Sequence, residues 1–153
     1  MLCLNRDKKG NTMWVIEDEN KVPTKRAKIQ LFKTLIVEDS SIFRKLLKET
    51  LNLRFPSMEI FEASKGEEAL QIMNANPLNL IFMDIRLPGE SGLELTSKLK
   101  VKYPDVVVII MTSFDTPEYR EAAIQAKADH FLSKGSSSKE SILKLVESIL
   151  GGA

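Results

Sequence analysis

Five short strand-like runs alternate with helical patterns in residues 31–153, and this alternation limits the fold more than any other feature of the chain. The runs occupy residues 34–37, 58–62, 78–84, 106–111 and 131–132. Each run is followed by apolar residues at helical spacing. Neighbouring parallel strands need a crossover connection, which is usually a helix and is right-handed. The alternation therefore predicts an α/β fold with a doubly wound, five-stranded parallel sheet and helices on both faces.

Capping residues mark the expected starts of the five helices. Ser40 precedes the first helical pattern and Thr116 precedes the fourth, where Pro117 suits the first helical position. The other three starts have the spacing of a capping box, a serine three residues before a glutamate. These pairs are Ser64 with Glu67, Ser91 with Glu94, and Ser137 with Glu140. The sequence thus predicts a defined N-terminus for each helix.

Residues 1–30 stand apart from this alternation. They show no sustained period, and residues 21–28 have the composition of a solvated basic linker. We expect a flexible N-terminal extension over residues 1–30 and one domain over residues 31–153. Residues 1–33 carry eight Lys or Arg against four Asp or Glu, whereas residues 34–153 carry fourteen against seventeen. The mildly acidic domain argues against direct binding of nucleic acid.

The cellular setting follows from what the chain lacks. Cys3 is its only cysteine, so an internal disulfide is excluded and a reducing compartment is the simplest setting. No apolar run approaches the roughly 18 residues of a membrane span, and the N-terminus has no apolar core of a signal peptide. We expect a cytoplasmic protein without membrane association.

Chemically active side chains stand at the exits of four predicted strands. They are Glu38 and Asp39 after the first, Asp84 after the third, Thr112 after the fourth and Lys134 after the fifth. Ligands of open parallel sheets bind beyond the carboxyl ends of the strands. Three carboxylates gathered there would repel one another, so either some take up a proton or a cation joins them.

The side chains at these exits indicate which ligand they would hold. A set of oxygen ligands without Cys or His favours Mg²⁺ over zinc. A hydroxyl and an ammonium group beside the metal suit an anion with several oxygens, such as a phosphoryl group. Asp84 alone would most simply cap the following turn. Its companions on the neighbouring strands favour a phosphoryl site instead.

These residues, in this order and on these strand ends, resemble the receiver domain of two-component response regulators. The resemblance covers about residues 32–150 and includes Pro88 and Gly92 behind Asp84, and Phe131 before Lys134. It implies the flavodoxin-like or CheY-like (βα)5 fold with strand order 2-1-3-4-5. It also implies that Asp84 becomes an aspartyl phosphate by attacking a phosphohistidine on a histidine kinase or phosphotransfer protein.

The resemblance implies a role for each of the other site residues. Asp39, Asp84 and the backbone carbonyl of Arg86 would bind Mg²⁺, and Glu38 would act through a water molecule. Lys134 would pair with the phosphoryl oxygens. Thr112 would move to hydrogen-bond the phosphoryl group, and Phe131 would swing into the vacated space, so that the last two helices and the last strand report phosphorylation.

Three positions depart from the commonest pattern of this family. Gly135 follows Lys134 where many relatives have proline, so a cis peptide is not assured there. Arg86 and Phe114 each stand two residues beyond a site residue, where the family tunes the lifetime of the phosphate. A long cation and a large ring are expected to restrict the access of water, which predicts slow loss of phosphate.

The chain is interpreted as a stand-alone receiver because the last predicted helix ends close to residue 153. Such a protein catalyses its own phosphorylation and dephosphorylation and acts through a downstream protein partner; a phosphorylation-dependent homodimer is compatible with this interpretation. Two alternatives remain. A small Mg²⁺-dependent phosphohydrolase would need a second Asp where Arg86 stands, and a phosphate-independent interaction module would not need the site. His130, the only histidine, is interpreted as a strand-edge residue rather than a phosphodonor.

Overall fold

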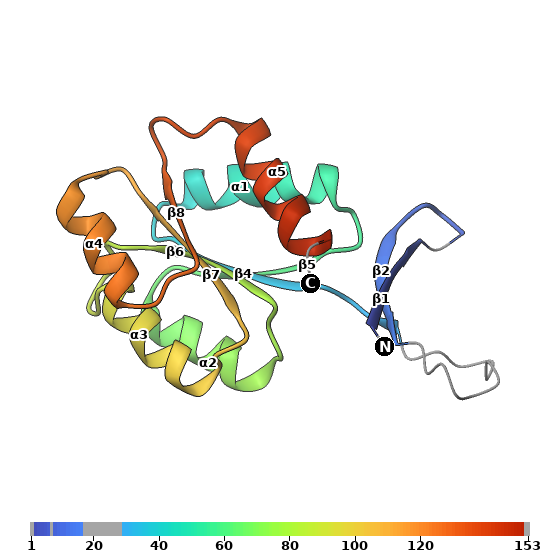
Figure 1. The fold of residues 1–153 in the computed structure, drawn as a ribbon, viewed down its shortest axis with the longest axis horizontal. Helices are drawn as coiled ribbons and strands as arrows, with labels where there is room; N and C mark the ends of the chain where they lie inside the picture. Colours follow the sequence, from blue (N-terminus) through green and yellow to red (C-terminus); the bar gives the residue numbers. More distant parts are fainter. Residues whose placement is uncertain (1, 7, 17–28, 152–153) are drawn as a thin grey trace.

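The main sheet of the protein has five parallel strands. The structure is a computed structural model that describes residues 2–6, 8–16 and 29–151. The strands lie in the order β5-β4-β6-β7-β8, which confirms the predicted order 2-1-3-4-5 (Figure 1). Their bounds are β4 Lys33–Val37, β5 Glu59–Ala63, β6 Leu80–Asp84, β7 Val107–Thr112 and β8 His130–Ser133.

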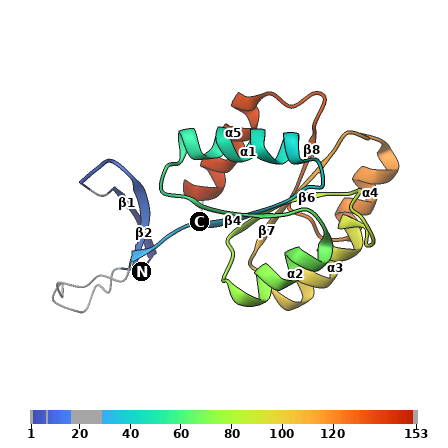
Figure 2. The ribbon, with the colours of Figure 1, turned by 180° about the vertical axis from the view of Figure 1, so that it is seen from behind.

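Five helices cover the two faces of this sheet. They are α1 Ser41–Arg54, α2 Gly66–Ala75, α3 Gly92–Lys102, α4 Pro117–Gln125 and α5 Lys139–Gly151. Helices α1 and α5 lie on one face, and α2, α3 and α4 lie on the other (Figures 1 and 2). Within the described residues, no helix combines the length and the apolar character needed to cross a membrane.

Alternating side chains of each strand enter two separate cores. In β4, Leu35 and Val37 pack with the residues under α2, α3 and α4, whereas Ile36 packs with those under α1 and α5. The central strand β6 is buried along its whole length. Because both faces are covered, β6 and β7 consist of nearly continuous apolar residues rather than an alternating pattern. The carboxylate of Asp84 is therefore held at the end of the most buried strand.

The side chains of three predicted caps act as expected. Ser40 Oγ accepts a hydrogen bond from the Phe43 amide at 3.3 Å, and Thr116 Oγ1 accepts one from Tyr119 at 3.2 Å. Ser91 Oγ accepts from the Leu93 amide at 3.2 Å. These contacts start α1, α4 and α3 directly beyond the strand ends that carry the candidate site residues.

The other two predicted caps are wrong. Helix α2 starts after Lys65, whose side chain makes no cap contact, while Ser64 Oγ donates to Glu68 Oε1 at 2.7 Å instead. Helix α5 is capped by Ser138, whose hydroxyl accepts from the Ser141 amide at 3.1 Å. The Ser137 amide donates to the Ser133 carbonyl and so belongs to the preceding turn. Ser137 and Ser138 could each cap α5 with a hydroxyl group, and the length of the turn after β8 decides which of them does so.

A second, antiparallel sheet was not predicted. Strands β1 Leu2–Arg6, β2 Thr12–Ile16 and β3 Ile29–Gln30 form it in the order β1-β2-β3. It meets the main domain where Ser57 Oγ donates a hydrogen bond to the Thr12 carbonyl. The predicted basic linker, residues 21–28, lies outside the described residues, and the division of the chain at residue 30 stays a prediction.

Candidate functional site

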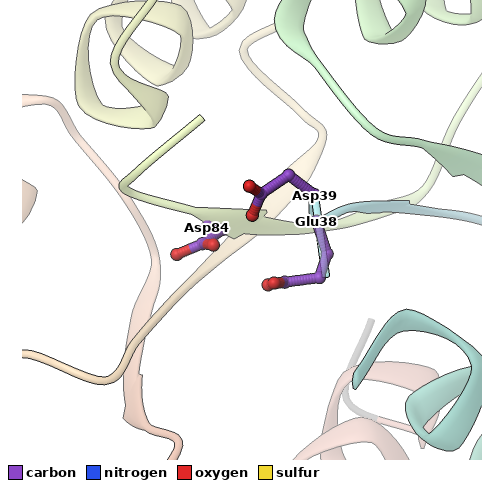
Figure 3. Close-up of side chains that lie close together, drawn as sticks. All are labelled: Glu38, Asp39 and Asp84. Atoms are coloured by element: carbon purple, nitrogen blue, oxygen red, sulfur yellow. The ribbon is translucent and has the colours of Figure 1, made fainter. Parts of the chain in front are cut away.

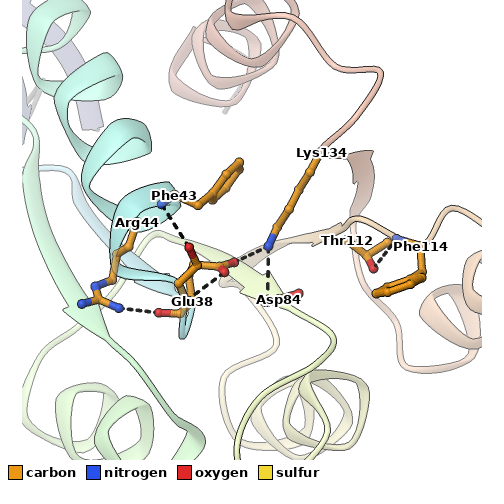
Figure 4. A network of polar contacts seen from close by, with 8 residues as sticks. Glu38, Phe43, Arg44, Asp84, Thr112, Phe114 and Lys134 are labelled. Carbon is orange, nitrogen blue, oxygen red and sulfur yellow. Dashed lines mark hydrogen bonds and ion pairs between the residues drawn. The ribbon is translucent and has the colours of Figure 1, made fainter.

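The candidate site lies at the carboxyl edge of the main sheet. Glu38 and Asp39 follow β4, Asp84 ends β6, Thr112 ends β7, and Lys134 follows β8. Figure 4 shows Glu38, Asp84, Lys134 and Thr112 side by side, although they come from four different strands. His130 begins β8, at the other end of that strand from Lys134.

Three carboxylates form a compact cluster at this edge. One oxygen atom of each of Glu38, Asp39 and Asp84 lies within 4.8 Å of the others, and the three side chains converge in Figure 3. Asp84 is 6% exposed and Glu38 is 1% exposed, whereas Asp39 lies at the surface. Buried acids are costly unless cations balance them. This donor set, made only of oxygens and open to solvent at Asp39, fits a Mg²⁺ ion.

Lys134 provides the positive charge of the cluster. Its Nζ donates to Glu38 Oε2 at 2.6 Å and to Asp84 Oδ2 at 3.3 Å, and it lies 4.6 Å from the centre of the Phe43 ring. The sequence placed Lys134 beside Asp84 but did not reveal its shorter contact with Glu38 or its packing on Phe43. The Lys134–Gly135 peptide bond, left open by the sequence, is trans.

The ionisation of Glu38 reflects these opposing influences. Burial raises the pKa of the Glu38 carboxyl above its ordinary value, the hydrogen bond from Lys134 counteracts this, and the charge of Asp84 reinforces it. Lys134 is 13% exposed at its side chain, so water screens this pair only weakly. The pKa of Glu38 nevertheless remains raised, so the contact with Lys134 offsets only part of the cost of burying this charge.

A second basic residue holds the turn that carries the acidic pair. Arg44 Nη1 donates to the backbone carbonyl of Glu38 at 2.6 Å, and Arg44 Nε lies 3.3 Å from Glu62 Oε1 in β5. The Glu38 side chain also accepts from the Ser40 amide at 3.2 Å. Sequence reasoning missed Arg44; its only signal was a cation six residues beyond the acidic residue at the strand exit.

The other predicted site residues lie at or just beyond the ends of β6 and β7, and within β8. Thr112 is buried, and its Oγ1 accepts a hydrogen bond from the Phe114 amide at 3.0 Å. The Arg86 guanidinium lies 3.7 Å from the centre of the Phe114 ring, a cation–π contact. Phe131 is half-buried, and the Arg120 guanidinium lies 4.7 Å from the centre of its ring. The structure thus joins Arg86 and Phe114 into one stacked pair beside Thr112.

The fold and this strand-end site define a receiver domain, and comparison with known proteins agrees. The family model described as "Response regulator receiver domain" matches residues 34–147. The chain belongs to this family. The family comprises the receiver domains of two-component response regulators, in which accepting a phosphoryl group is the general function.

The curated relatives are proteins of several kinds. The chemotaxis protein CheY of Halobacterium salinarum is 31% identical over 118 residues, which cover 77% of this chain and 96% of that protein. The response regulator UvrY of Escherichia coli O6:H1 is 30% identical over 122 residues, 80% of this chain and 56% of UvrY. A cyclic di-GMP phosphodiesterase of Thermotoga maritima is 35% identical over 100 residues, 65% of this chain and 26% of that protein. The chain therefore spans about half of UvrY and about a quarter of the phosphodiesterase.

Solved structures agree with the fold. A CheY-like receiver domain protein from Methanospirillum hungatei matches with a TM-score of 0.74 and 25% identity, covering 80% of this chain and 96% of that one. The response regulator TrrA from Thermotoga maritima, solved in complex with Mg²⁺-BeF, matches with a TM-score of 0.68 and 31% identity. That match covers 78% of this chain and 99% of TrrA. The flavodoxin/CheY-like fold predicted from the sequence is confirmed.

Proposed function

We propose that Asp84 is the phosphoacceptor and that a histidine kinase or a histidine phosphotransfer protein is its donor. A carboxylate oxygen of Asp84 forms a bond to phosphorus while the phosphorus–nitrogen bond of the phosphohistidine breaks, and the imidazole nitrogen keeps the electron pair. The observation that carries this proposal is the buried Asp84 carboxylate at the end of β6, 3.3 Å from Lys134 Nζ and clustered with two further acids.

The residues around Asp84 would bind Mg²⁺ and the negatively charged oxygens of the phosphoryl group. Asp39, Asp84 and the backbone carbonyl of Arg86 would hold Mg²⁺, with Glu38 acting through a water molecule; the complex of TrrA with Mg²⁺-BeF supports such a site. Bound there, the ion would supply positive charge for the oxygens of the transferred group. Lys134 would turn from Glu38 to an oxygen of the phosphoryl group on Asp84, whose carboxylate it already contacts at 3.3 Å.

Signal output would pass through Thr112 to the face formed by α4, β8 and α5. The Thr112 hydroxyl accepts from the Phe114 amide, so its own proton can be donated to a phosphoryl oxygen. Movement of Thr112 toward the phosphoryl group would vacate space for Phe131, whose ring packs against the Arg120 guanidinium in this structure. Phosphorylation would then shift the balance between two pre-existing states and change the binding of a downstream protein.

Labelling with acetyl phosphate tests this function. The protein is incubated with acetyl phosphate and Mg²⁺, and intact mass is followed over time. One slowly decaying phosphoryl group per chain, absent after chelation of Mg²⁺, is the expected result. Rapid multiple turnover would instead indicate a Mg²⁺-dependent phosphohydrolase, which the arginine at position 86 disfavours, and no labelling would indicate a phosphate-independent module.

The stacked pair of Arg86 and Phe114 is expected to prolong the lifetime of the phosphate. The two side chains stack beside Thr112. There they would restrict the approach of water to the aspartyl phosphate, and removing either would admit water. R86A, which keeps the backbone carbonyl, and F114A should each shorten the half-life of the aspartyl phosphate about tenfold, a barrier change of about 1.4 kcal/mol. The measurement is loss of the phosphoryl mass after removal of acetyl phosphate.

A remote variant controls for general effects on that half-life. Val101 is exposed on α3, so V101A removes apolar surface without touching the site. It should decay like the parent protein. Equal half-lives for V101A, R86A and F114A would refute the proposed restriction of water.

A further inference from the structure

Arg44 joins three elements of the fold behind the acidic cluster. Arg44 lies near the start of α1. Its Nη1 donates to the Glu38 carbonyl just beyond β4, and its Nε forms an ion pair with Glu62 in β5. The side chain of Arg44 is 19% exposed, and Lys48, one turn further along α1, also binds Glu62 at 2.9 Å. Figure 4 shows Arg44 on the far side of Glu38 from Lys134. Arg44 therefore lies next to the acidic cluster but is not itself a candidate metal ligand.

The contact with the Glu38 carbonyl restrains the peptide unit that precedes Asp39. The Glu38 amide donates to the Ala63 carbonyl at 3.0 Å, which continues the pairing of β4 with β5 beyond the strand end. With Arg44 on the carbonyl, both backbone polar groups of Glu38 are held. The peptide unit that links Glu38 to Asp39 is planar, so fixing its carbonyl also fixes the Asp39 amide and Cα. The Asp39 side chain leaves the backbone at this Cα, so the peptide unit limits where its exposed carboxylate can reach.

We infer that Arg44 is a positioning residue for Mg²⁺ binding, acting through the peptide unit that links Glu38 to Asp39. The inference rests on the proposed function, in which Mg²⁺ assists the phosphorylation of Asp84. Arg44 and Lys48 share the single negative charge of Glu62, but only Arg44 also reaches the Glu38 carbonyl, so the geometric role is specific to Arg44. The guanidinium fork reaches two partners on two strands, whereas a lysine ammonium is a single point of contact. Arg44→Lys should therefore fail to replace Arg44.

Mg²⁺ titration by calorimetry on the unphosphorylated full chain tests this inference. R44K and R44A are each expected to raise the dissociation constant for Mg²⁺ about tenfold, as is usual when a residue that orients metal ligands is replaced. They should slow labelling by acetyl phosphate at limiting Mg²⁺ and recover most of the rate at saturating Mg²⁺. Thermal unfolding of each variant shows whether the fold is retained.

Lys48→Ala is the matched control, because it removes the other cation bound to Glu62 from the same helix but leaves the Glu38 carbonyl untouched. Its Mg²⁺ affinity should equal that of the parent protein, even if its melting temperature falls as in R44A. Parent-like affinity in R44K, or equal weakening in R44A and K48A, would overturn the inference. If the parent protein binds Mg²⁺ but is not labelled, the proposed function fails while the role of Arg44 in binding is still decided by the titration.

Discussion

Replacing Asp84 by asparagine is expected to abolish labelling by acetyl phosphate and to leave the fold intact. An amide of the same shape lacks the nucleophilic oxygen, so labelling should fall on the order of a thousandfold or more. Affinity for Mg²⁺ should fall as well, because the cluster loses one of its three carboxylates. Lys134 keeps its shorter contact, at 2.6 Å with Glu38, so the remaining buried acid stays paired.

The stability of D84N separates loss of chemistry from loss of structure. Removing one charge from three clustered acids relieves repulsion, so the free energy of unfolding should change by no more than about 1 kcal/mol in the absence of metal. Asp105→Asn serves as the control, since Asp105 is exposed in the turn before β7. Labelling of D105N should match the parent protein. Stoichiometric labelling of D84N would remove Asp84 from the proposed role.

Replacing Gly92 by alanine should be the most destabilising of the substitutions considered. A Cβ atom at this position would lie 1.9 Å from the Asp84 carbonyl oxygen and 2.9 Å from its carbon. Both atoms belong to the backbone of a buried strand, so neither can turn aside. The Gly92 amide donates to the Ile85 carbonyl at 2.8 Å, which holds α3 against the end of β6. We expect a loss of about 4 kcal/mol or more in the free energy of unfolding, or roughly 10 °C in melting temperature.

Gly66→Ala is a control with the same chemical change. A Cβ at Gly66, in the first turn of α2, would meet its nearest atom, Leu95 Cδ2, at 3.5 Å, an ordinary packing distance. Alanine also favours a helix over glycine by up to about 1 kcal/mol. G66A should therefore melt near or above the parent protein. If G92A melts at the same temperature as G66A, α3 does not lie as close to the Asp84 carbonyl as described.

The five strands and helices of the main domain could be predicted because their signals are local. The runs that became β6 and β7 are apolar over several residues, and each ends at a polar residue with a capping residue further on, Ser91 after β6 and Thr116 after β7. The strand ends Asp84 and Thr112 are therefore visible without any tertiary contact. The predicted capping boxes at Ser64 and Ser137 failed because that motif describes spacing and not the length of the preceding turn.

Contacts between distant segments could not be predicted in the same way. The pairing of Lys134 with Glu38 joins residues 96 positions apart, and the stacking of Arg86 on Phe114 joins two loops. The antiparallel sheet of β1, β2 and β3 depends on pairing that short segments with weak patterns do not reveal. Arg44 carries no motif, and its contacts arise only where α1 crosses the ends of β4 and β5.

The sequence by itself determined the class of fold and the residues that meet at the carboxyl edge of the sheet, because hydrophobic period and strand exits are properties of consecutive residues. Only the tertiary structure decided which of those residues touch. It put Lys134 closer to Glu38 than to Asp84, placed Arg44 behind the acidic pair, and brought α3 against the Asp84 carbonyl. These distances depend on how helices pack on a twisted sheet, which no local pattern encodes.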